Sequence, residues 1–127
     1  MTQLSSQRTE QLNPDQLEAF VARRAEGPVR MLNLLKFKAD GGAESYMKYG
    51  AAVAPLLEKA GGAIVYTGAP TELLIGDRDW DLIALVEYPT RQAFLDMVGS
   101  PEYQAIEHLR HDALERSVLY ATDPAPL

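Results

Sequence analysis

Short apolar runs bounded by glycine, proline and acidic residues predict four β-strands. Each run is too short for a helix and ends at residues that are typical of turns. The predicted strands cover 29–37, then 63–66 with 71–75 as one strand interrupted near 68–70, then 80–88 and 117–122. Gly76-Asp77-Arg78-Asp79 lies between the second and third strands, so we expect an antiparallel hairpin with a short loop.

Segments with apolar residues at a helical period lie between these strands. A long helix is predicted to end at Gly61-Gly62, where glycine suits a left-handed cap. Thr90 is a favourable N-cap for a short helix over 90–98. Ser100, followed by a proline, is a favourable N-cap for another helix over 101–114.

The N-terminal region predicts one additional helix before the first strand. In Asn13-Pro14-Asp15-Gln16, asparagine suits the N-cap, proline the first helical position, and glutamine a capping box. We expect this helix over 13–25, after a loose N-terminal segment formed by residues 1–11. Residues 123–127 are expected to be a frayed tail.

The order of the remaining elements predicts the fold class. Strand, helix, strand, strand, helix, strand forms two strand–helix–strand halves joined by a hairpin, which is the split βαβ arrangement of ferredoxin-like α+β folds. We therefore expect a single domain over 1–127, with a ferredoxin-like core over 28–122. Its sheet should have four antiparallel strands, with the helices on one face.

The strands are apolar on both sides, which predicts self-association. Within 80–88, one side carries Ile83 and Leu85 in its middle and acidic residues only at its ends, and the other side is apolar throughout. Because helices cover one face only, a second copy related by a two-fold axis is expected to cover the other. The alternative is that the N-terminal helix folds back over that face of its own subunit.

Composition and charge exclude several classes of function. The chain has 12 basic and 18 acidic residues, a net charge of −6, and no cysteine. It therefore lacks a basic surface for nucleic acid, and it has no thiolate nucleophile or cysteine-ligated metal. No apolar run approaches the roughly 20 residues of a membrane span. We expect a cytoplasmic protein without nucleic-acid or membrane partners.

Several short motifs follow one another along the chain, namely Met31–Phe37, Tyr46–Gly50, Leu56-Leu57 with Gly61-Gly62, Trp80–Pro89, and Ser100–Ile106 with Arg110. As an ordered set they resemble the domain-of-unknown-function family thirteen-thirty, in the dimeric α/β-barrel superfamily. The resemblance covers roughly 28–122 and excludes the first helix. It implies a ferredoxin-like subunit whose sheet pairs with a second one into a barrel. Relatives in the superfamily include cofactor-free monooxygenases, lactone isomerases and haem enzymes, which is an analogy of fold alone.

Arg110 is the most informative polar residue because it falls on the apolar face of its predicted helix. A buried guanidinium needs carboxylates or carbonyls for its donors. Glu87 and Asp81, at the ends of a strand, are the candidate partners. Arg110 is therefore either an anchor for a ligand's anionic or carbonyl group, or half of an ion pair that ties helix to sheet.

Tyrosines form the second candidate group. Tyr46, Tyr49 and Tyr103 project onto the sheet-facing sides of their helices. With Asn33 and Tyr66 from strands, they are candidates to line a cavity for a small carbonyl or aromatic compound, and Tyr103 is a candidate acid or hydrogen-bond donor. The alternative is that these tyrosines are core residues whose hydroxyls are satisfied.

No metal or cofactor site is expected. His108 and His111 point away from the apolar face, and their spacing differs from that of the zinc-protease motif. Asp77, Asp79 and Asp81 alternate as in a calcium loop, but the following glycine and glutamate are absent. No phosphate-binding glycine loop or nucleophile elbow is present.

Two functional hypotheses follow from these residues. In the first, a homodimer binds a small organic molecule between sheet and helices and acts as a cofactor-independent oxygenase or isomerase, with Arg110 as the anchor and Glu87, Asp81 or Tyr103 as further catalytic candidates. In the second, the chain is a non-catalytic dimeric structural or interaction module, and the same residues are structural.

Overall fold

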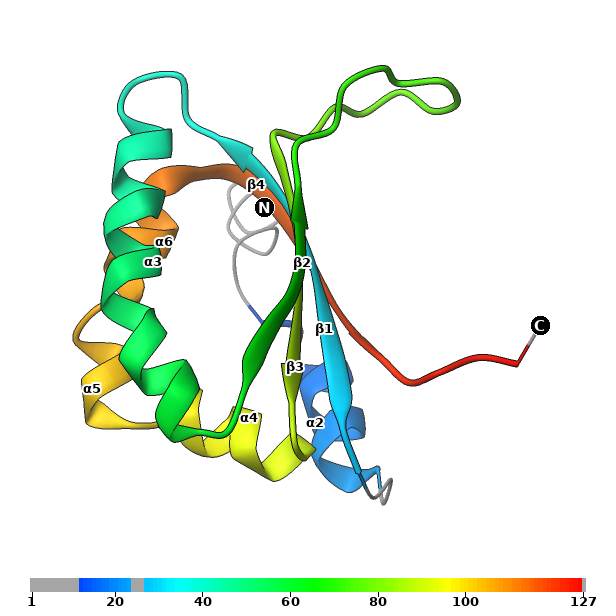
Figure 1. The fold of residues 1–127 in the computed structure, drawn as a ribbon, viewed down its shortest axis with the longest axis vertical. Coiled ribbons are helices and arrows are strands. Elements are labelled where there is room, and N and C mark those ends of the chain that lie inside the picture. The colour runs from blue at the N-terminus through cyan, green and yellow to red at the C-terminus, as the bar shows by residue number, and fades with distance from the viewer. Residues whose placement is uncertain (1–11, 24–26, 127) are drawn as a thin grey trace.

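The computed structural model describes residues 12–23 and 27–126, and they form one antiparallel sheet with a helix layer on one face (Figure 1). The strand order is β2-β3-β1-β4. This is the order of the split βαβ arrangement, so the predicted fold class is confirmed. The strands are β1 (Val29–Phe37), β2 (Ala63–Gly68), β3 (Leu82–Tyr88) and β4 (Leu114–Thr122).

The helix layer consists of α3 (Gly42–Lys59), α4 (Arg91–Val98), α5 (Pro101–Gln104) and α6 (Glu107–Ala113). The helix predicted over 101–114 is therefore two helices. Thr90 Oγ accepts from the Ala93 amide at 3.0 Å, and Ser100 Oγ accepts from the Tyr103 amide at 3.1 Å, which confirms both predicted N-caps. Gly61 has φ 78°, as its predicted role at the end of α3 requires.

The main core lies between the sheet and this layer. Alternate residues of β1 and β3 point toward the helices and meet apolar side chains of α3, α4 and α5. The buried members of this cluster are Val29, Met31, Tyr49, Leu57, Tyr88, Phe94, Met97 and Tyr103.

Close packing fixes α3 against α6. A Cβ atom on Gly42 would lie 2.6 Å from the carbonyl oxygen of Ala113, so the two backbones meet there without a side chain between them. Ser45 Oγ also donates to the Leu109 carbonyl at 2.9 Å. These contacts set the position of α6, which carries Arg110.

The connection between β2 and β3 differs from the prediction. The strand predicted over 71–75 does not form, β3 begins at Leu82 rather than Trp80, and residues 69–81 form a long exposed loop. The antiparallel pairing of β2 with β3 is confirmed, but the short loop is wrong. Pro70 lacks a backbone donor, and residues 71–75 lie beyond the last paired residues of the sheet.

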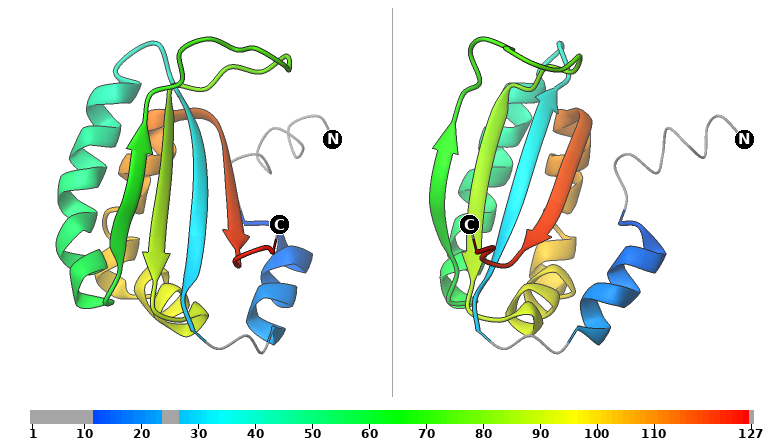
Figure 2. Two further views of the ribbon diagram at one scale, coloured as in Figure 1. Left: turned by 45° about the vertical axis from the view of Figure 1, so that its right-hand side comes forward. Right: turned by 90° about the vertical axis from the view of Figure 1, so that its right-hand side faces the viewer.

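The face of the sheet opposite the helices is apolar in its middle, as predicted. The register places Leu32 of β1 between Leu85 and Tyr120, and Leu34 between Ile83 and Val118. We call the side of the sheet that carries these residues the open face. In the described chain no helix covers it (Figure 2).

Helix α2 (Pro14–Ala22) lies beside the β4 edge of the sheet, next to α4 (Figure 2). The alternative in which it covers the open face is therefore wrong. The Asn13 side chain makes no capping bond, so the predicted capping box is also wrong, although Pro14 begins the helix as expected. The loose N-terminal segment predicted over 1–11 and the helix residues predicted at 24–25 lie outside the described residues.

Candidate functional site

A cavity of about 1240 Å³ lies between the sheet and the helices. Its wall is formed by residues of β1, β3, β4, α3 and α4, and α2 with its flanking residues also contributes to the lining. Its lining includes most of the residues predicted to bind a ligand, namely Asn33, Tyr46, Tyr49, Tyr103 and Arg110. An apolar cavity with a few converging polar groups is the usual form of a small-molecule site.

Arg110 enters this cavity from α6 and is half-buried. Its Nη2 donates to Oδ1 of Asn33 at 3.4 Å. The Asn33 amide nitrogen donates in turn to the carbonyls of Met31 and Ala84, both at 3.4 Å, which orients its oxygen toward Arg110. Among the described residues no carboxylate lies within ion-pair distance of Arg110.

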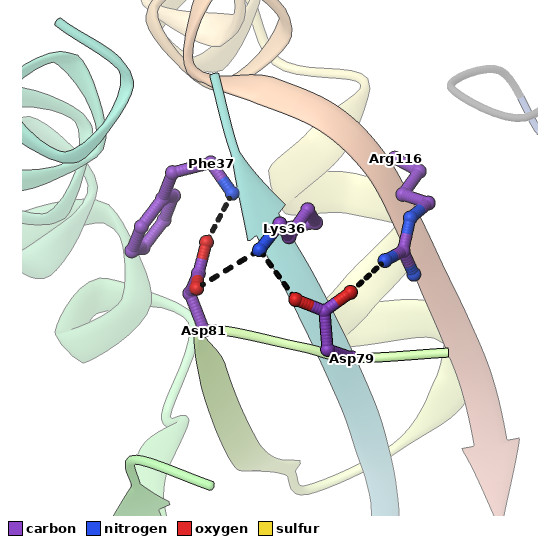
Figure 3. Close-up of polar contacts among 5 residues, drawn as sticks. All are labelled: Lys36, Phe37, Asp79, Asp81 and Arg116. Atoms are coloured by element: carbon purple, nitrogen blue, oxygen red, sulfur yellow. Dashed lines mark hydrogen bonds and ion pairs between the residues drawn. The ribbon is translucent and has the colours of Figure 1, made fainter. Parts of the chain in front are cut away.

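The predicted ion pair between Arg110 and Glu87 or Asp81 is therefore wrong. Glu87 accepts from Arg30 Nε at 2.9 Å. Asp81 accepts from the Phe37 amide at 2.9 Å and pairs with Lys36 at 3.4 Å (Figure 3). Arg30 and Lys36 lie on the same side of β1 as Leu32 and Leu34, so both carboxylates are engaged by side chains of the open face.

Tyr49 and Tyr103 form the hydrogen-bonded pair of the site. Their hydroxyl oxygens are 2.8 Å apart, and both side chains are buried. Burial, and then the neighbouring Tyr103, raises the pKa of Tyr49 well above its ordinary value. Burial also raises the pKa of Tyr46, although the positive charge of Arg110 opposes this. Tyr46 and Tyr49 therefore stay protonated at neutral pH and can donate to a ligand.

Tyr66 lies outside the cavity, contrary to prediction. It pairs in register with Leu85, which places it on the open face, and it is 58% exposed. The β2–β3 register shifts between Ile64 and Tyr66. Because of this irregularity, Tyr66 does not lie on the same side of the sheet as Ile64, as strict alternation would require.

Tyr88 and Glu107 are polar residues of the cavity that sequence reasoning did not name as candidates. Tyr88 lines it and donates to the sulfur of Met97 at 3.9 Å, and burial raises the pKa of Tyr88. The signal for Tyr88 is that it lies two positions after Val86 and therefore on the same side of the strand. Glu107 also lines the cavity and precedes Arg110 by one helical turn, a spacing that could have found it.

His108 and His111 are both exposed, and His111 also lines the cavity. Within 12–23 and 27–126, no three histidine or acidic side chains are grouped so as to hold a metal ion. None of the helices in these same ranges is long and apolar enough to span a membrane.

Residues 40–123 match the family model described as Domain of unknown function (DUF1330). The chain belongs to the DUF1330 family. The match begins after β1, whereas the resemblance was predicted to begin at residue 28. A crystal structure of a protein of unknown function from Rhodopseudomonas palustris is 32% identical to this DUF1330 protein, with a TM-score of 0.84. The similarity covers 92% of this chain and 97% of that one.

More distant structures share the fold of this DUF1330 protein. One is a Dabb family protein with a ferredoxin-like fold from Mesorhizobium loti, at 13% identity and a TM-score of 0.60, covering 80% of this chain and 100% of that one. Another is a dimeric ferredoxin-like protein of unknown function from Jannaschia, at 12% identity and a TM-score of 0.63, covering 77% and 100%. No curated protein matches the chain.

Proposed function

We propose that this DUF1330 protein is a homodimer that binds a small organic molecule with a carboxylate or carbonyl group in the cavity between sheet and helices. Arg110 carries this proposal. Its guanidinium has five donors, is half-buried in the cavity, and makes one long hydrogen bond to a neutral side chain. A carboxylate or carbonyl oxygen would accept from guanidinium donors of Arg110 other than the one that bonds to Asn33.

The tyrosines support a catalytic version of this proposal. Protonated Tyr46 and Tyr49 near a guanidinium are groups that can stabilise negative charge on an oxygen atom of a bound molecule. That is the requirement of a cofactor-independent isomerase or oxygenase that forms an enolate from an activated carbonyl compound. Glu107 is the carboxylate of α6 that lines the same cavity and is the candidate to accept a proton.

The open face supports the homodimer. Its apolar residues Leu32, Leu34, Ile83, Leu85 and Val118 form a continuous patch in the described chain. A patch of this kind on a soluble protein marks an interaction surface, and a two-fold axis lets one surface cover itself. Proteins of the same fold from Jannaschia and Thermobifida fusca are described as dimeric.

A non-catalytic dimeric module is the second candidate. The observation that favours it is the Tyr49–Tyr103 bond, because the two hydroxyls satisfy each other without a ligand. In that case Arg110 and Asn33 would form a structural contact between α6 and β1.

Native mass spectrometry of protein purified gently from its own cells separates these candidates. We expect a dimer that carries a stoichiometric additional mass, and an Arg110→Ala variant that remains a folded dimer without that mass. Lys48→Ala, at an exposed position of α3, is the control and should retain the mass.

A thermal-shift screen with small carboxylates and carbonyl compounds detects a ligand that binds too weakly to remain bound during purification. The wild-type protein should gain thermal stability with at least one compound, and Arg110→Ala should lose that gain. If no compound stabilises the wild type more than Arg110→Ala, and purified protein carries no additional mass, the binding proposal is wrong and the structural module stands.

A further inference from the structure

The loop of residues 69–81, which we call the arm, carries Leu74 and Ile75, the two most exposed large apolar side chains of the described chain. Leu73 is 55% exposed, Leu74 88% and Ile75 95%. Three consecutive aliphatic residues facing water are unfavourable in an isolated subunit, and grouped exposure of this kind marks a contact surface.

The base of the arm is held in place by ion pairs (Figure 3). Asp79 accepts from Lys36 Nζ and from Arg116 Nη2, both at 2.7 Å. Arg116 also lies over the ring of Trp80, 4.5 Å from its centroid. Lys36 and Arg116 are register partners on β1 and β4, so the arm is anchored to the sheet itself.

The direction of the arm follows from this anchoring. It leaves the end of the sheet and projects to the side opposite the helix layer, beyond the open face (Figure 1). A view onto the open face shows the arm coming forward at one end of the sheet (Figure 2). A second subunit that packed on the open face would therefore lie beside the arm.

We propose that the arm packs with Leu73, Leu74 and Ile75 against the second subunit of the homodimer. The inference rests on the homodimer of the proposed function and adds a second contact to it. Because a two-fold interface is reciprocal, each subunit would extend its arm over the other. The apolar side chains that the single subunit exposes would then be buried by the same event that covers the open face.

Charge argues against other occupants of the arm. Asp79 at the base of the arm is already paired with Lys36 and Arg116, but Glu72 and Asp77 flank the three aliphatic residues in the sequence. An anionic membrane surface or a nucleic acid would be repelled by these carboxylates. A second copy offers instead an apolar sheet face of matching character.

Cysteine labelling tests the position of the arm directly. The chain has no cysteine, so Ile75→Cys introduces a single thiol without background. We expect a maleimide to react with this thiol at least tenfold more slowly in the dimer than in a version made monomeric by Leu85→Asp. Met47→Cys, exposed on the outer side of α3, is the control and should react equally in both.

The dimer dissociation constant provides a second test that does not depend on labelling. Leu74→Glu with Ile75→Glu removes two buried aliphatic side chains from the interface, which should raise the dissociation constant about a hundredfold or more. Met47→Glu should leave it unchanged. Circular dichroism of the arm variant should match the wild type, since neither residue is buried in the subunit.

The outcomes separate this inference from the proposed function. A wild-type protein that is monomeric at every concentration overturns the arm contact and the homodimer of the proposed function, and leaves the ligand site to the mass and thermal-shift measurements. The arm contact alone is overturned if the wild type is a dimer, Leu74→Glu with Ile75→Glu leaves its dissociation constant unchanged, and Ile75→Cys reacts equally fast in dimer and monomer. Binding of neutral phosphatidylcholine vesicles that requires Leu74 and Ile75, with dimerisation unchanged, would also overturn it and assign the arm to a membrane surface.

Discussion

Burial of tyrosine hydroxyls makes the stability of the subunit sensitive to alkaline pH. The pKa of Tyr49 and that of Tyr88 are raised in the folded protein, first by burial and then by neighbouring tyrosines. In the unfolded chain a tyrosine ionises near pH 10. Above that pH the unfolded chain therefore holds fewer protons than the folded one, and the free energy of unfolding falls as the pH rises.

We predict that the free energy of unfolding is unaffected by these groups below about pH 10 and decreases above it. Each such tyrosine contributes a slope of about 1.4 kcal/mol per pH unit while only its unfolded form is ionised. Urea unfolding at pH 9, 10 and 11 measures the slope. Tyr49→Phe should reduce it, and Tyr120→Phe, at an exposed position, should not. An equal slope in wild type and Tyr49→Phe would contradict this account.

The position of Arg110 was predictable, but its partners were not. Its helical spacing placed it on the apolar face, and the structure puts it in the cavity. Asp81 and Glu87 lie on the same side of the predicted strand as Leu85, and that side faces away from the helices. Only the choice of face, which depends on where α3 and α6 pack, decides which side chains Arg110 can reach.

At the scale of elements, α2 is the piece held least firmly. It has no buried residue, and its Phe20 packs against the main core, with the Phe20 and Phe94 ring centroids 5.6 Å apart. The Arg91 guanidinium also lies 5.2 Å from the Phe20 ring centroid, and Arg23 pairs with Asp123 at 3.2 Å. Because α2 lines part of the cavity, its attachment affects access to that cavity.

We predict that Phe20→Ala detaches α2 without unfolding the core. The loss of one partly exposed aromatic contact should cost the global free energy of unfolding no more than about 1–2 kcal/mol. Hydrogen exchange should show loss of protection over 14–22 and unchanged protection in β1 and β3. Val21→Ala, at an exposed position of the same helix, is the control. Retained protection over 14–22 would show that other contacts hold α2.

The arm shows what an apolar pattern alone cannot decide. Leu73, Leu74 and Ile75 have the composition of a strand, and an apolar run predicts burial without saying whether the same chain supplies the cover. The helices were predicted more closely because their caps are local. Thr90 and Ser100 mark the beginnings of α4 and α5 by bonds to residues three positions away.

At the scale of the whole molecule, one sheet separates two different environments. The helix-facing side holds the cavity and its tyrosines, whereas the open face is apolar in the middle and carries ion pairs toward its ends. Arg30 pairs with Glu87 toward one end, and Lys36 with Asp79 toward the other. Such an arrangement gives a two-fold partner an apolar centre to bury and charged groups that can remain in water at its rim.

We predict that Leu85→Asp converts the dimer to a monomer while the subunit remains folded. Leu85 lies on a central strand in the middle of the open face, and its side chain faces away from the cavity. A carboxylate there would be buried without a partner in the dimer but solvated in the monomer, so the cost falls on association. Analytical ultracentrifugation measures the mass, and circular dichroism verifies the fold. Met47→Asp on α3 should remain dimeric.

The same variant separates ligand binding from assembly. The cavity lies between sheet and helices of one subunit, and Leu85 does not line it. A monomeric Leu85→Asp protein should therefore still respond to any compound that stabilises the wild type through Arg110, with a similar thermal shift. Loss of that response in a folded monomer would mean that the second subunit completes the site, and the arm would then be the first segment to test for a contribution to it.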